Sequence, residues 1–163
     1  MAKPHSNPVS IEELRRILDY NPETGEFCWK VYRPGKKPNQ FGVMATNGYV
    51  VTRIGYQKYL LHRLAWAHFY GYWPQNVDHI NRIKTDNRIC NLREATRSQN
   101  LANRSVRAKS GFKGVVLVKG RYRASITVNS KSNYLGLYTT PEEAHLRYAT
   151  EAKKVFGEFA CLQ

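Results

Sequence analysis

Acidic residues, cysteines and long apolar runs are all scarce in this chain of 163 residues. The 12 Asp and Glu are outnumbered by 26 Lys and Arg, and the net charge of +14 favours a partner with many negative charges. No apolar run is long enough to cross a membrane, and the first residues lack the apolar segment of a secretory signal. We therefore expect a cytoplasmic protein with no membrane partner.

The three cysteines, Cys28, Cys90 and Cys161, are an odd number and include no C-x-x-C pair. This argues against a disulfide framework and against a structural zinc site, so we expect small buried apolar residues at these positions. The chain is 42% hydrophobic and 12% aromatic, enough to bury a core. Its length suits one domain or two small ones and excludes a large multidomain enzyme.

The first part of the chain predicts helices alternating with hairpins after a loose leader at residues 1–9. Ser10 and Glu13 form a capping box that starts a helix, which continues through Leu18 and which the turn residues 21–25 end. Alternating apolar residues predict strands, and a longer apolar stretch predicts a buried helix. The strands lie at 27–31, before a turn at 34–38, and at 49–54 and 59–61, and the helix spans 62–70.

The composition of the chain changes at two further points. Residues 75–103 are rich in Asn, Asp and His with little apolar periodicity, which is typical of a segment that performs chemistry. Residues 104–111 are short, basic and rich in small residues, as in a linker along a phosphate backbone. Residues 112–163 predict three strands and a helix that begins at Thr140. We therefore expect an α+β protein with domains at 10–103 and 112–163.

Four polar residues in the segment 75–103 form the candidate active site: Asp78, His79, Asn91 and Asn100. Two short strands that fold back on each other would bring His79 near the segment after Leu92, and a Thr96–Gln99 capping box would start a helix bearing Asn100. The Asp78 carboxylate and the Asn100 amide oxygen suit a hard divalent cation, Mg²⁺ or Mn²⁺. His79, on the other side of its strand, could then act as a base.

The pattern Asp78-His79, Asn91-Leu92-Arg93 and Gln99-Asn100 resembles the HNH nuclease motif, in the variant of phage and intron-encoded homing endonucleases whose last position is Asn. The resemblance implies a ββα-metal fold at about 75–103, with His79 as the general base and with Asp78 and Asn100 as ligands of the divalent metal. It further implies that Asn91 holds the loop together through backbone hydrogen bonds and so orients His79. The implied reaction is phosphodiester hydrolysis assisted by a single metal.

Two neighbouring residues have open interpretations. Arg93 follows Asn91 closely enough to contact the scissile phosphate, and it fits a solvated surface arginine equally well. His62, at the start of an apolar helix, fits a partly buried residue that supports the fold better than a residue that contacts DNA or that supports the catalytic residues from behind. We do not assign His62 to catalysis.

The C-terminal segment 121–128 alternates apolar with basic and hydroxylic residues, which predicts a sheet with one face against a helix and the other open to nucleic acid. The chain contains the motifs Lys113-Gly114-Val115, Arg121-Tyr122-Arg123-Ala124 and Glu142-Glu143-Ala144. With these motifs, residues 112–160 are similar to the DNA-binding domain of plant ethylene-response factors. Val116 and Val118 stand where those domains usually carry base-contacting arginines, so their target sequence cannot be transferred. The resemblance implies that the DNA-facing side of the sheet carries Lys113, Arg121, Arg123 and Tyr134.

The sequence thus predicts a metal-dependent DNA endonuclease of the HNH homing type, in a bacterial or phage-infected cell. Its expected partner is double-stranded DNA, with Arg104, Arg107 and Lys109 of the linker along the backbone. We expect no obligatory protein partner and either a monomer or a DNA-bound dimer. The alternatives are a non-catalytic DNA-binding regulator with a degenerate nuclease fold and an RNA-binding accessory protein, which competition between duplex DNA and RNA would separate.

Overall fold

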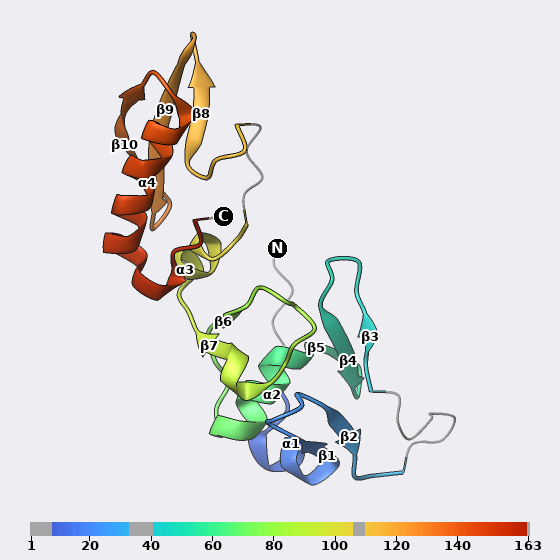
Figure 1. Cartoon of the computed structure of the whole chain (residues 1–163). Coiled ribbons are helices and arrows are strands. Elements are labelled where there is room, and N and C mark those ends of the chain that lie inside the picture. Colours follow the sequence, from blue (N-terminus) through green and yellow to red (C-terminus); the bar gives the residue numbers. More distant parts are fainter. Residues whose placement is uncertain (1–7, 33–40, 106–109, 163) are drawn as a thin grey trace, which may run out of the picture. The chain divides into compact units, whose positions relative to one another are not determined.

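The computed structural model describes residues 8–32, 41–105 and 110–162 (Figure 1). The chain divides into two compact units, residues 1–94 and 95–163, each of which combines helices with antiparallel strands. This confirms a mixed helix and sheet fold. The boundary between the units falls after Glu94 in the sequence, before the predicted linker at 104–111. The assignment of separate functions to residues 10–103 and 112–163 stays a prediction. Residues 1–7 of the leader expected at 1–9, and the turn expected at 34–38, lie outside the described residues.

The first helix begins as predicted and ends earlier. The Ser10 hydroxyl accepts a hydrogen bond from the Glu13 backbone N–H at 3.2 Å, and helix α1 spans Ile11–Ile17. The next residues form strand β1 (Leu18–Tyr20), so the prediction that the helix continues to the turn at 21–25 was wrong. Leu18 and Tyr20 are both buried, and residues two apart share a face only in an extended chain.

The turn at 21–25 instead joins two strands. β1 pairs antiparallel with β2 (Phe27–Trp29). A second sheet has the strand order β3-β4-β5, formed by Val43–Met44, Val50–Ile54 and Gln57–Leu60. The β4–β5 hairpin confirms the predicted strand pair at 49–54 and 59–61.

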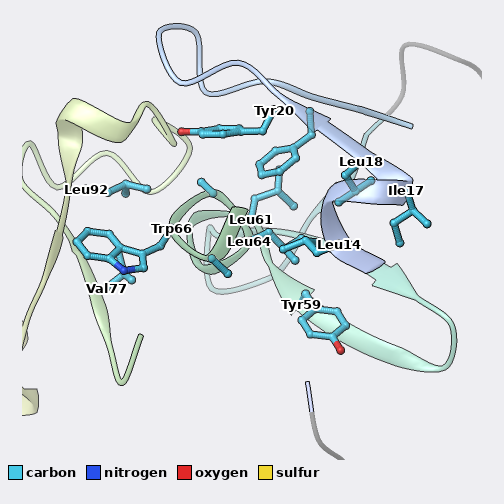
Figure 2. Packing of buried hydrophobic residues seen from close by; sticks show 13 residues of the cluster. Leu14, Ile17, Leu18, Tyr20, Tyr59, Leu61, Leu64, Trp66, Val77 and Leu92 are labelled. Carbon is cyan, nitrogen blue, oxygen red and sulfur yellow. The ribbon is translucent and has the colours of Figure 1, made fainter. Parts of the chain in front are cut away.

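Helix α2 (Leu61–Tyr70) is the centre of the first unit and matches the predicted buried helix at 62–70. It ends at Gly71, whose φ of 81° is the left-handed conformation common after a helix. Leu64 and Ala65 have no exposed surface. Figure 2 shows side chains of α1, β1 and β5 packed around α2, whose burial on several sides explains its nearly continuous apolar sequence.

The candidate motif lies on the other side of this core. Strand β6 (Val77–His79) pairs antiparallel with β7 (Leu92–Glu94), with the 3₁₀ helix η1 (Ile89–Asn91) directly before β7. Val77 and Leu92 are buried in the same core cluster as Trp66 of α2, beside which both lie in Figure 2. Apolar residues of both strands therefore anchor the polar residues next to them.

The second unit contains the predicted three strands and a helix. The sheet has the order β10-β9-β8, formed by Lys131–Tyr138, Arg121–Val128 and Val115–Val118. Helix α4 spans Pro141–Phe156 after the predicted Thr140 cap, and η2 (Gly157–Phe159) follows it. α4 buries one stripe of apolar side chains against the sheet: Ala144, Tyr148, Ala152 and Phe156.

The cysteines only partly follow the expectation. All three are free thiols, and Cys161 is buried as predicted. Cys28 and Cys90 are exposed, so the expectation of buried apolar residues was wrong for these two. Cys28 faces outward because it alternates along β2 with the buried Phe27, and Cys90 lies in η1 at the surface.

Candidate functional site

Strand β6 buries Asp78 and His79 next to each other in the chain, with 6% and 4% of their surface exposed. Successive residues of a strand point to opposite faces, so the two side chains have different neighbours. The His79 Nε2 atom lies 3.4 Å from the Oδ1 atom of Asn87. A carbonyl oxygen only accepts hydrogen bonds, so Nε2 carries the proton and Nδ1 is the basic nitrogen of the ring.

Asp78 forms an ion pair with Arg93, which lies opposite it in the β6–β7 register. The Arg93 Nε and Nη2 atoms lie 3.1 Å and 3.0 Å from Asp78 Oδ2, and both side chains are almost completely buried. Arg93 is therefore not the solvated surface residue that one sequence interpretation offered. Its contact with a phosphate stays a prediction.

Asn91 joins the two ends of the loop that connects β6 to β7. Its Oδ1 atom accepts from the Asn81 backbone N–H at 3.0 Å, and its Nδ2 atom donates to the Asp86 carbonyl at 2.8 Å. The Asn91 carbonyl also accepts from the Ile80 N–H at 2.9 Å. These bonds tie the two ends of the loop together. The closed loop places Asn87 against His79.

The sequence analysis missed Asn87, which that loop places against His79. Asn87 is 4% exposed, and its Nδ2 atom donates to the Thr85 carbonyl at 3.3 Å, which keeps Oδ1 on the histidine. The Tyr20 hydroxyl donates to the Asn87 carbonyl at 2.8 Å. No periodicity or motif spacing distinguishes Asn87 from the other asparagines of this polar segment, since its role follows from contacts made across the fold.

His62 of α2 is a second neighbour of His79, and only the less favoured sequence interpretation placed it behind the catalytic residues. The two rings meet edge to face with centroids 4.9 Å apart, and the Tyr49 ring lies 5.1 Å from His62 and 5.9 Å from His79. His62 is 5% exposed, so its burial agrees with the fold-supporting interpretation. Its contact with His79 also makes it a neighbour of the candidate site.

Burial keeps both imidazoles neutral. It lowers the pKa of His62 to about 3, with the nearby His79 and Arg63 as smaller causes. It also lowers the pKa of His79 below its usual value, although the hydrogen bond with Asn87 acts in the opposite direction. A neutral imidazole is the form that accepts a proton, so His79 is in the basic state near neutral pH.

Acidification should destabilise the first unit through His62. Its pKa is about 3 in the folded protein against 6.5 for the free side chain, so below pH 6.5 the unfolded chain binds the proton more readily. This contribution to the free energy of unfolding is complete above pH 6.5 and falls by up to about 1.4 kcal/mol per pH unit as the pH decreases towards 3. Denaturant unfolding across this range should show a smaller slope for His62→Phe than for the wild type, and equal slopes would contradict the assignment.

The predicted metal ligands lie in different units. Asp78 belongs to the first, and Asn100 lies in α3 (Arg97–Ala102) of the second, which starts with the predicted capping box of Thr96 and Gln99. Among the described residues no group of three or more His, Cys, Asp or Glu side chains could hold a metal ion. The carboxylate of Asp78 and the amide of Asn100 are oxygen donors of the type that Mg²⁺ and Mn²⁺ prefer, so their chemistry fits such an ion.

The predicted DNA-binding residues have different surroundings. Arg121, Arg123 and Tyr134 are exposed on the sheet of the second unit, and Arg104 is exposed after α3. Lys113 instead directs its ammonium group at backbone carbonyls, those of Ala102 and of Arg104. Arg107 and Lys109 lie outside the described residues.

Comparison with known proteins identifies the region that contains this site. Residues 59–102 match the family model of HNH endonucleases, a range that runs from the end of β5 through α2, β6 and β7 to the end of α3. These residues are similar to an HNH endonuclease domain, and the match covers less than half of the chain. The match spans the four candidate residues Asp78, His79, Asn91 and Asn100.

A viral relative carries a name that is consistent with this match. The chain is 39% identical over 85 residues to a protein of Acanthamoeba polyphaga mimivirus named as an uncharacterized HNH endonuclease. The aligned part is 52% of this chain and 44% of the relative, so this chain spans less than half of that protein. The family match and this relative support the prediction that the protein is a nuclease. No solved structure matches the chain, and none of the described helices is long and apolar enough to cross a membrane.

Proposed function

We propose that this protein is a metal-dependent DNA endonuclease of the HNH homing type, which hydrolyses a phosphodiester bond of duplex DNA. The observation that carries the proposal is the buried neutral imidazole of His79, held by Asn87 in a strand of the HNH domain. The second unit would position the enzyme on its target through the exposed face of its sheet. We further propose that the protein acts in a bacterial or phage-infected cell without an obligatory protein partner.

In this mechanism His79 is the general base. Its Nδ1 atom takes a proton from the attacking water, while Nε2–H keeps its hydrogen bond to the side-chain Oδ1 atom of Asn87, which fixes the ring. The imidazolium that forms is stabilised by that same oxygen. Asn91 acts on His79 indirectly, because its bonds to Asn81 and Asp86 hold the loop that carries Asn87.

Asp78 and Asn100 are the residues that would hold the divalent metal. A bound Mg²⁺ or Mn²⁺ would stabilise the negative charge that develops on the phosphate and on the departing 3′ oxygen. The guanidinium of Arg93 balances the charge of the buried Asp78 carboxylate, which keeps an ionised oxygen donor stable inside the protein. Arg93 thereby places a cationic side chain directly beside the proposed metal ligand Asp78.

Incubation of supercoiled plasmid libraries with the protein tests this proposal. In Mg²⁺ we expect nicked or linear DNA, and in EDTA we expect none, because the oxygen ligands bind a hard divalent cation. Binding of duplex DNA in EDTA should decrease steeply with salt, since the chain carries a net charge of +14. Salt-sensitive binding without any cleavage in Mg²⁺ or Mn²⁺ would contradict the nuclease and favour a DNA-binding regulator.

A further inference from the structure

The sheet of the second unit has one face covered by α4 and one open face. Along β9 the residues toward α4, Ala124 and Ile126, are 0% and 3% exposed, whereas Arg121 and Arg123 on the opposite face are exposed. The alternation predicted from the sequence is thus present. This open face is accessible to a large partner.

Aliphatic side chains flank the arginines on this open face. The register places Val116 of β8 and Leu137 of β10 on either side of Arg123, and paired residues of antiparallel strands point to the same face. Val116 is 48% exposed and Leu137 is 42% exposed. Tyr134, paired with Ser125 on the same face, is 62% exposed. The face therefore presents a cross-strand row with a cation in the centre and an aliphatic group at each end.

The chemistry of this row matches one edge of duplex DNA. In the major groove guanine presents two acceptors that suit an arginine, and thymine presents a C5 methyl group, the aliphatic feature of that groove. The chain has a net charge of +14, which favours a polyanion such as DNA as the partner of this face over an acidic or apolar surface of a protein. A sheet that offers Val116, Arg123 and Leu137 in one row can contact both kinds of base edge together.

We propose that Val116 and Leu137 read thymine by packing on its C5 methyl group in the major groove, next to the Arg123 contact. This inference rests on the proposed DNA-binding role of the second unit and adds the sequence class that it would prefer. The protein should select sites with thymine next to guanine. The exposed side chains then become buried on binding, which removes apolar surface from water.

Replacing thymine by uracil tests the proposal, because uracil lacks only the C5 methyl group and pairs with adenine in the same way. Sites are first selected from a random duplex library in EDTA, and the best site is then made with thymine or with uracil. We expect binding to weaken about fourfold for each methyl group that the protein buries. Val116→Ala and Leu137→Ala together should remove most of this difference between the two duplexes.

Leu117→Ala is the matched control. Leu117 follows Val116 in β8, is 58% exposed, and pairs with Tyr122 on the opposite face of the sheet. This variant should keep the thymine preference of the wild type. Equal binding of the thymine and uracil duplexes by the wild type would overturn the inference, as would a preference that persists in the double variant. Failure to bind any duplex would instead refute the proposed DNA-binding function.

Discussion

Cleavage of duplex DNA should fall by a factor of about 10²–10⁴ in His79→Ala, which removes the proposed general base. The substitution removes the ring whose Nε2 atom lies 3.4 Å from the Asn87 Oδ1 atom, and with it the proposed basic Nδ1 atom. The binding of DNA should change little, because His79 is 4% exposed and the sheet that we propose to bind DNA belongs to the second unit. Supercoiled plasmid in Mg²⁺ measures the rate, and salt-dependent binding in EDTA measures the affinity.

His145→Ala is the control for this experiment. His145 lies in α4, outside the HNH domain, and its Nδ1 atom is 3.2 Å from the Lys113 carbonyl. Loss of a histidine there should leave the cleavage rate near that of the wild type. If His79→Ala lost DNA binding together with cleavage, His79 would be a structural residue and the proposed mechanism would be wrong.

Gly114→Ala should destabilise the second unit by about 2–5 kcal/mol. Gly114 has a φ of +75°, and a Cβ atom there would lie 2.1 Å from the Cδ2 atom of Tyr148, which is 5% exposed in the core beneath α4. The substitution therefore combines backbone strain with displacement of a buried ring. Chemical denaturation should show the loss of stability, and DNA binding should weaken with it.

Gly120→Ala separates these two causes. Gly120 has a similar φ of +79°, yet a Cβ atom there would meet nothing within 4 Å. Its cost should be the backbone strain alone, about 1–2 kcal/mol. Equal destabilisation by the two substitutions would show that the contact with Tyr148 contributes nothing.

Local signals predicted most of the secondary structure. The helix caps at Ser10, Thr96 and Thr140 were all confirmed, because a capping side chain bonds to a backbone group only a few residues away. The end of α1 was predicted wrongly. The pattern through Leu18 is helical, yet the burial of both Leu18 and Tyr20 in the core favours a strand. Tertiary packing decided that boundary.

The candidate site shows the same division. Asp78, His79 and Asn91 were identified from their spacing, and the roles assigned to them stay predictions. Asn87 and His62 were not identified as neighbours of His79, since neither residue belongs to the spacing that marks the motif. The pairing of Arg93 with Asp78 depends on the β6–β7 register, which a list of residue types does not specify.

The sequence by itself determined the basic charge, most of the strand and helix pattern, and the candidate motif residues, because these depend on composition and on interactions between near neighbours. Only the tertiary structure decided what each motif residue touches: His79 against Asn87 and His62, and Asp78 against Arg93. It also decided that Lys113 bonds to backbone carbonyls. The physical reason is that these contacts join residues of different elements or loops, beyond the range of helix or strand periodicity, and packing of the apolar core fixes where those segments lie.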